Sequence, residues 1–144
     1  MSIHYSLAIS KIAPSLALSK LIENIPEHHQ ENYYILSPGL LISTNTKPSK
    51  LTIDIIEDEF GFTPTVNIVI NWYQVDVPLA TRINLIKGCM EVINNTNCDA
   101  VLLFEAETIV FLYKNGKLVL NKIDGFWVDE VLVVIPIPYE FELI

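Results

Sequence analysis

The sequence predicts one α+β domain over residues 1–144, made of a mostly antiparallel sheet and two helices. Three observations predict this class. A tight-turn signal joins two apolar runs near residue 115, an apolar repeat of helical period runs through residues 78–95, and no repeat or linker divides the chain. The expected order is β-α-ββββ-α-βββ with an extended tail, because runs of strands separated by single helices are typical of α+β folds.

The strongest local signal is Asn115-Gly116, because both residues accept the positive φ that a two-residue hairpin turn requires. Such a turn also fixes which residues face each other across the two strands. The predicted pairs are Lys114 with Lys117, Tyr113 with Leu118, Leu112 with Val119, and Phe111 with Leu120.

Both faces of this hairpin are apolar, and so is the preceding strand over residues 100–104. A sheet with one wet face would alternate apolar and polar residues, so we expect both sides to be covered by helices, a long loop or a partner subunit. One face is predicted to carry Ile109, Phe111, Tyr113, Leu118 and Leu120, and the other Val110, Leu112, Val119 and Asn121.

The chain begins with alternating residues over 3–9, which predict a half-buried strand. Pro14 suits the first turn of a helix expected over about 14–25, and Pro26 ends it. Residues 27–32 form a polar stretch, which we predict to be a loop.

Four strands are expected next, over residues 33–36, 40–44, 51–56 and 66–72. The third is assigned from the alternation of Leu51, Ile53 and Ile55 with their neighbours, and Glu57-Asp58-Glu59 closes it.

The second helix is expected over about 78–95, with Asp76 as a candidate cap and Pro78 in the first turn. Residues 131–135 predict a last strand or a short helix, and 137–144 an extended tail or edge strand, since Pro136 and Pro138 cannot serve a central strand. The predicted apolar face of the helix is Leu79, Ile83, Ile86, Met90 and Ile93.

The composition of the chain limits the classes of function that we expect. The formal net charge is −8, which argues against nucleic-acid binding, where clustered Lys and Arg neutralise phosphates. No apolar run is long enough for a membrane span and no signal peptide is visible, so we expect a cytoplasmic protein that makes no membrane contact. Cys89 and Cys98 are expected as free buried thiols. Only 18% of residues are charged, so the surface carries few charged side chains. Such a surface is compatible with an oligomer interface, for example that of a homodimer.

No motif for catalysis, metal binding or a cofactor is recognisable, and we expect no catalytic residue and no cofactor. His28-His29 lacks the spacing of metal ligands and is interpreted as solvated. Glu57, Asp58 and Glu59 are interpreted as a solvated strand end or an acidic surface for a partner, and Glu105 and Glu107 as a polar turn of the same kind. Gly125-Phe126-Trp127 is predicted to be an aromatic lid on the sheet, in the core or in contact with a ligand or partner.

Four segments carry a family resemblance. In order they are DAVLLF at residues 99–104, GKLVLN at 116–121, GFW at 125–127 and PIPYE at 136–140. Together they resemble the Sit-type immunity proteins, the cytoplasmic partners of contact-delivered or outer-membrane-exchanged bacterial toxins. The resemblance lies mainly over residues 98–140, carries no catalytic residues, and makes Asn121 and Trp127 the first matched positions to test.

The resemblance implies a non-catalytic protein that neutralises a cognate protein toxin by stoichiometric binding. The residues expected to contact the toxin are Glu57, Asp58, Glu59, Glu105, Glu107 and Trp127. One alternative is a small-molecule-binding or enzymatic domain with a pocket between sheet and helix, lined by Tyr33, Tyr34, Trp72 and Trp127. A second is a homo-oligomeric structural protein.

Overall fold

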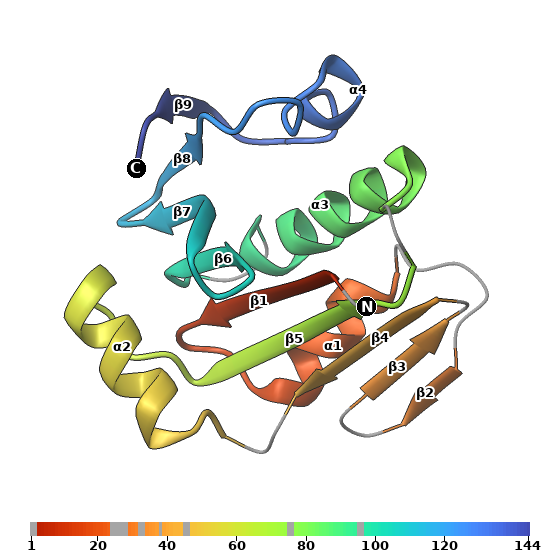
Figure 1. Cartoon of the computed structure of the whole chain (residues 1–144). Coiled ribbons are helices and arrows are strands. Elements are labelled where there is room, and N and C mark those ends of the chain that lie inside the picture. Colours follow the sequence, from red (N-terminus) through yellow and green to blue (C-terminus); the bar gives the residue numbers. More distant parts are fainter. Residues whose placement is uncertain are drawn as a thin grey trace.

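The computed structural model describes residues 3–23, 29–31, 34–37, 39–44, 47–74, 77–94 and 97–144. In these residues nine strands form one sheet in the order β2-β3-β4-β5-β1-β6-β7-β8-β9. All neighbours are antiparallel except β8 and β9, which are parallel. The predicted α+β class with a mostly antiparallel sheet is confirmed. The strands are β1 Ile3–Ile9, β2 His29–Glu31, β3 Tyr34–Ser37, β4 Leu40–Thr44, β5 Val66–Trp72, β6 Ala100–Phe104, β7 Thr108–Lys114, β8 Lys117–Asn121 and β9 Tyr139–Glu142 (Figure 1).

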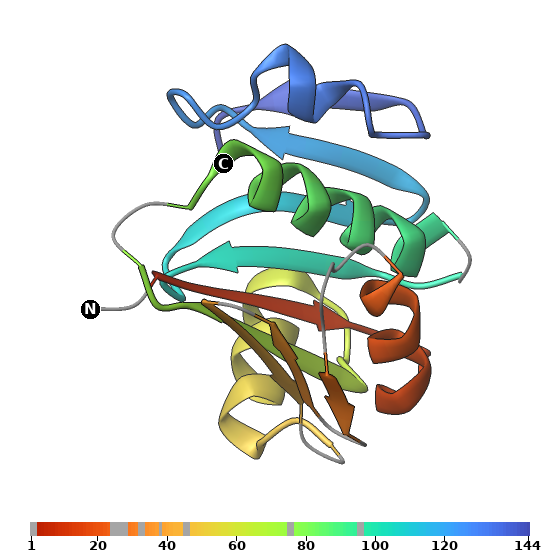
Figure 2. The same ribbon diagram turned by 90° about the vertical axis from the view of Figure 1, so that its right-hand side faces the viewer.

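The helices lie on both faces of the sheet. Helices α1 (Pro14–Ile22), α3 (Leu79–Asn94) and α4 (Asp129–Leu132) cover one face, and α2 (Lys50–Phe60) covers the other. Figure 2 shows α1 and α3 in front of the strands and α2 behind them.

The two faces carry separate apolar clusters, because successive side chains of a strand point to opposite sides. On the α3 face, Leu7 and Phe111 pack with Ile86 of α3, all three fully buried. On the α2 face, Ala8 and Val101 of the sheet pack with Ile56 of α2. The prediction that both sides of the sheet are covered is therefore correct.

The prediction of a strand at Leu51–Ile56 is wrong, because this segment belongs to helix α2. Ser49 caps the helix by accepting a hydrogen bond from the main-chain N–H of Thr52 at 3.2 Å. Gly61 ends it with φ +73°, the left-handed conformation usual after a helix. Only Ile56 and Phe60 of the helix are buried, and Leu51 is 70% exposed, so the alternation of apolar residues does not mark a sheet face.

The structure also differs from expectation in the polar loop after α1 and at the end of α1. Part of the predicted polar loop, His29–Glu31, forms strand β2 at the edge of the sheet. The described part of α1 ends at Ile22, and α3 runs from Leu79 to Asn94, close to the predicted limits. Asp76, the candidate cap of α3, lies outside the described residues.

The hairpin register is confirmed for all the predicted pairs, from Lys114–Lys117 to Phe111–Leu120. The predicted face of Ile109 is wrong. The pairing of β6 with β7 shifts by one residue, because Leu102 faces Phe111 while Leu103 faces Ile109. The extra residue, Val110, forms a bulge. As a result Val110 joins Phe111 in the α3-side cluster, and Ile109 packs with the α2-side cluster.

Helices α1 and α3 approach closely at Gly88. A Cβ atom at this position would lie 2.6 Å from Cδ1 of Leu21 and 3.3 Å from the Leu21 carbonyl oxygen. Leu21 is fully buried, so its side chain has no free space into which to move.

We expect Gly88→Val to destabilise the fold by about 2–3 kcal/mol through overpacking between the two helices. Urea unfolding followed by circular dichroism measures the loss. Lys87→Val is the matched control, because Lys87 is exposed on the same helix and the same residue type is introduced. Equal losses in the two variants would contradict close packing at Gly88.

Cys89 and Cys98 are free and buried, as predicted. Burial raises the pKa of the Cys89 thiol from 9.0 to about 12. In the folded state the thiol therefore stays protonated at pH values where the unfolded chain releases the proton. This preference stabilises the fold fully below pH 9, and the contribution is lost as the pH rises from 9.0 towards about 12.

Between pH 9 and 11 the stability of the wild-type protein is expected to fall more steeply than that of Cys89→Ala. The extra slope reaches at most about 1.4 kcal/mol per pH unit, the value for one proton. Urea unfolding at several pH values measures both slopes. Parallel curves would show that Cys89 ionises as easily in the fold as in the unfolded chain.

Candidate functional site

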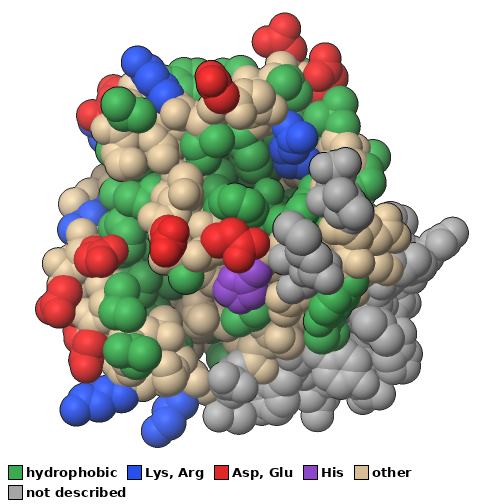
Figure 3. Space-filling model, viewed as in Figure 1, with side chains coloured by type: hydrophobic (Ala, Val, Ile, Leu, Met, Phe, Trp, Pro, Cys, Tyr) green, Lys and Arg blue, Asp and Glu red, His purple; other side chains and the backbone are tan. Residues whose placement is uncertain are grey.

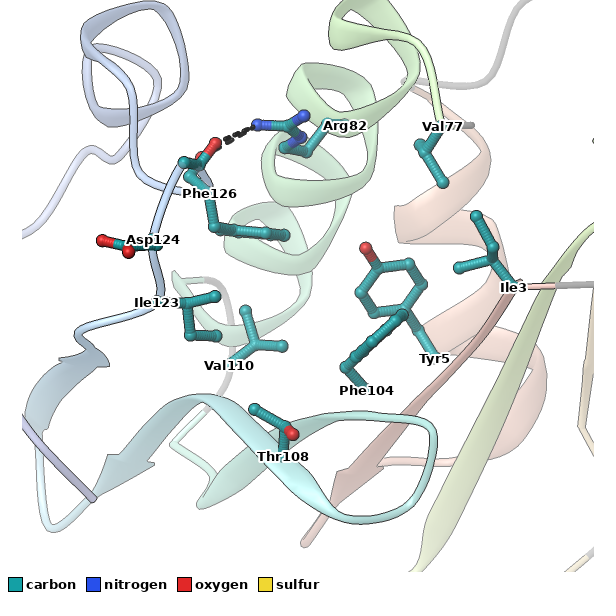
Figure 4. A pocket seen from close by; sticks show the side chains of 11 residues that line it. Ile3, Tyr5, Val77, Arg82, Phe104, Thr108, Val110, Ile123, Asp124 and Phe126 are labelled. Atoms are coloured by element: carbon teal, nitrogen blue, oxygen red, sulfur yellow. Dashed lines mark hydrogen bonds between the residues drawn. The ribbon is translucent and has the colours of Figure 1, made fainter. Parts of the chain in front are cut away.

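An open pocket of about 420 Å³ lies between helix α3 and the sheet, where β1 begins and β6 ends (Figure 4). Its walls are mainly apolar and aromatic, with a few polar groups at the rim. The lining residues are Ile3, Tyr5, Val77, Arg82, Phe104, Thr108, Val110, Ile123, Asp124, Gly125 and Phe126.

Local features of β6 and β7 bring residues to this pocket. Phe104 and Thr108 line it from the two ends of the β6–β7 turn, in which Glu105 and Ala106 have φ of +52° and +59°. The bulge in β7 directs Val110 to the same side of the sheet. The turn and the bulge together shape the floor of the pocket.

Arg82 on α3 ties the loop that follows β8 to the helix. Its Nη1 donates hydrogen bonds to the carbonyl oxygens of Gly125 at 2.9 Å and Phe126 at 3.1 Å. Its guanidinium carbon also lies 5.3 Å from the centre of the Phe126 ring, in reach of a cation–π contact. These contacts hold Phe126 as one wall of the pocket. Sequence reasoning missed Arg82, although it is the chain's single arginine.

Tyr5 forms the wall opposite Phe126. It is only 6% exposed, and its ring lies 5.2 Å from that of Phe104. Figure 4 shows its hydroxyl pointing into the pocket. Among the residues that the structure describes, this hydroxyl has no hydrogen-bond partner. Burial raises the pKa of Tyr5, an effect that the positive charge of Arg82 opposes. The hydroxyl therefore keeps its proton at neutral pH and can donate a hydrogen bond.

Comparison with models of known protein families shows to which family this chain belongs. The model of one family, described as SitI3-like, matches residues 3–131, most of the chain. The chain belongs to the SitI3-like family. This confirms the Sit-type immunity family that residues 98–140 predicted, and extends the match over the middle of the chain. The searches of curated proteins and of solved structures gave no match.

The acidic residues predicted from the sequence lie at two separate places in this SitI3-like protein. Glu57, Asp58 and Glu59 are exposed on α2. Glu105 and Glu107 are exposed in the β6–β7 turn, beside the pocket. The two groups lie on different elements, although Ile55 and Ile56 of α2 and Ala106 of the turn line one shared hollow.

Glu105 also has a structural role. Its side chain accepts a hydrogen bond from the main-chain N–H of His4 at 2.9 Å, and its own N–H donates to the carbonyl of His4 at 2.8 Å. These bonds fix the start of β1 to the turn. Among the described residues, the Glu107 side chain makes no hydrogen bond or ion pair, so Glu107 is the simpler residue to change in an experiment.

Asn121 and Trp127, the two matched positions singled out in the sequence, are joined by hydrogen bonds. The indole Nε1 of Trp127 donates to the carbonyl of Asn121 at 2.9 Å. The Asn121 side chain is buried, donates to the carbonyl of Ile109 at 2.6 Å and accepts from the N–H of Ile144 at 3.0 Å. Asn121 therefore connects β7, the loop after β8 and the end of the chain. Trp127 is half-buried and its ring packs on Phe126, 4.7 Å away, so the aromatic segment does fold onto the sheet.

The other sequence candidates are described only in part. His28 and Tyr33, and the side chains of His29 and Tyr34, lie outside the described residues. Trp72 is buried in the core, and Trp127 lines a different, smaller pocket. A pocket between sheet and helix therefore exists, but neither Trp72 nor Trp127 lines it. In the described part of the chain, no group of His, Cys, Asp and Glu is arranged to hold a metal ion. None of the helices described is long and apolar enough to cross a membrane.

We expect Asn121→Ala to destabilise the protein by about 2–3 kcal/mol, because it leaves the Ile109 carbonyl and the Ile144 N–H without partners. Urea unfolding measures the loss, and hydrogen exchange should show faster exchange in β9. Asn94→Ala, at an exposed position of α3, is the control and should change stability by less than about 0.5 kcal/mol. A loss as small as that in Asn121→Ala would refute the bridging role.

Proposed function

We propose that this SitI3-like protein is an immunity protein that neutralises one toxin by stoichiometric, non-catalytic binding in the cytoplasm. The observation that carries the proposal is the family match over residues 3–131. A protein with this task needs a surface complementary to its partner in shape and charge, and no reacting group.

The charge of the protein supports a cationic partner. The formal net charge is −8, Asp124 lines the pocket, and Glu105 and Glu107 are exposed in the turn between the lining residues Phe104 and Thr108. On the face shown in Figure 3, acidic side chains lie over α2 and over the middle of the face, where Figure 1 places the β6–β7 turn. Such a field speeds association with a partner of opposite charge.

The direct test is protection. A host that expresses the toxin should die when the gene of this protein is deleted, and expression of the protein from a plasmid should restore growth. Purification of the tagged protein from its native host, followed by mass spectrometry, identifies the bound toxin. Normal growth of the deletion strain with an active toxin would refute the proposal.

We expect the double variant Glu107→Lys with Asp124→Lys to slow association with the purified toxin about tenfold at low salt, because it reverses charge at the pocket rim. Surface plasmon resonance at several salt concentrations measures the rate.

The matched comparison is Glu57→Lys with Asp58→Lys, which reverses the same number of exposed charges on α2. We expect a smaller effect there, because these residues lie away from the pocket. A larger effect on α2 would place the contact on the opposite face of the sheet, and no effect in either variant would refute an acidic contact.

Two alternatives have specific support. The pocket of about 420 Å³ has the size of a small-molecule site. Exposed apolar side chains on and after β9, among them Phe141 and Leu143, favour self-association. Ligand screening by thermal shift and light scattering at high concentration test these alternatives separately.

A further inference from the structure

The pocket between α3 and the sheet has the features of an anchor site for a partner protein. Resting on the immunity function proposed above, we propose that it takes one apolar side chain, aromatic or branched aliphatic, from a basic segment of the toxin. A carbonyl oxygen of the same segment accepts a hydrogen bond from the hydroxyl of Tyr5. The occupant is thus a protein chain with an apolar residue between lysines or arginines.

The size of the pocket suits an inserted side chain together with the peptide unit that carries it. Its volume of about 420 Å³ lies in the lower part of the range of small-ligand pockets, and it is open to solvent along one side. Phe104, Val110 and Phe126 offer apolar surface on three sides. Anchor residues of protein interfaces bind in pockets of this kind, where they lose contact with water.

The walls are held in place before any partner arrives. Arg82 fixes the main chain at Gly125 and Phe126 through two hydrogen bonds, and the Tyr5 ring rests on Phe104. A preformed pocket lowers the entropic cost of binding, since its side chains are already ordered. The same contacts occupy one end of the Arg82 guanidinium, and the other polar side chains that line the pocket are those of Tyr5, Thr108 and Asp124.

The hydroxyl of Tyr5 indicates that the occupant also supplies a hydrogen-bond acceptor. The residue is only 6% exposed, and its hydroxyl points into the pocket without a partner among the described residues. Once an occupant excludes water from the pocket, a donor left without an acceptor is unfavourable, and hydroxyls of buried tyrosines usually find one. An acceptor oxygen from the occupant meets this need, and a peptide carbonyl accompanies every inserted side chain.

The charges at the rim favour a basic partner over a second copy of this chain. Asp124 lines the pocket and is exposed, Glu105 and Glu107 are exposed in the turn between its lining residues Phe104 and Thr108, and the whole chain carries a formal net charge of −8. A second copy would bring the same negative charge to the rim, so repulsion opposes it. Lysines or arginines beside the inserted residue would meet the carboxylates instead.

The first test uses three capped pentapeptides as probes: Gly-Lys-Phe-Lys-Gly, Gly-Glu-Phe-Glu-Gly and Gly-Lys-Ala-Lys-Gly. Each is titrated to about 10 mM, a range that detects weak binding, against the isotope-labelled full chain, and NMR shifts are recorded. We expect the Lys-Phe peptide to shift resonances of Val110, Ile123 and Phe126. The Glu-Phe and Lys-Ala peptides should bind at least about tenfold more weakly.

Tyr5→Phe removes only the hydroxyl and should weaken binding of the Lys-Phe peptide about fivefold, as expected for one lost hydrogen bond. No shifts at the pocket, or equal binding of the Lys-Phe and Lys-Ala peptides, would overturn the inference. Binding of free indole or phenylacetate in the pocket without a response to any peptide would also overturn it, in favour of a small-molecule site.

The second test fills the pocket. Thr108→Trp and Val77→Trp introduce a large side chain from two different walls, and thermal melting checks that each variant folds. We expect the affinity for the purified toxin to fall about 30-fold or more in both, as for the loss of a central anchor. Leu51→Trp is the matched control, because Leu51 is exposed on α2 at the opposite face of the sheet.

The outcomes separate the two proposals. A toxin that binds the wild-type protein and both folded pocket-filled variants equally well overturns the anchor site and leaves the immunity function intact. A wild-type protein that fails to bind the toxin it is encoded with overturns the immunity function. In that case the peptide titrations still report whether the pocket accepts an apolar side chain between lysines.

Discussion

The pairing of β1 with strands on both of its sides is the interaction on which the rest of the structure depends. Its residues pair with β5 on one side and with β6 on the other, and it joins β2–β5 to β6–β9 in one sheet. Leu7 and Ile9 of this strand are fully buried under the helices of one face. The pocket depends on the same pairing, because Tyr5 of β1 and Phe104 of β6 face each other across it.

Much of the fold was predictable because its strongest signals are local. The Asn115-Gly116 turn fixed a register that the structure reproduces pair by pair. The alternation over six residues predicts a strand where helix α2 lies, because the capping residues Ser49 and Gly61 lie just outside that window. The bulge at Val110 was missed for another reason. The bulge depends on the pairing of β7 with β6, and no residue type in the sequence indicates it.

The candidate site was predictable only in part. The exposed turn with Glu105 and Glu107 was found from its composition, and it does border the pocket. The walls come from residues far apart in the chain, Tyr5 and Arg82 among them, which only the tertiary fold brings together. Asn121 and Trp127 were noticed through the family pattern, and their hydrogen bonds explain that pattern as a feature of the fold.

The central place of β1 has a consequence for how the chain is made. The ribosome synthesises this strand before its partners, because Ile3 pairs with Trp72 of β5 and Tyr5 pairs with Phe104 of β6. Its apolar side chains therefore have no partner strand until β5 and then β6 have emerged from the exit tunnel. Contacts so distant in sequence slow folding and leave a nascent chain open to aggregation. We expect the growing polypeptide to depend on chaperones over this interval, and the N-terminal half to remain unfolded when released on its own.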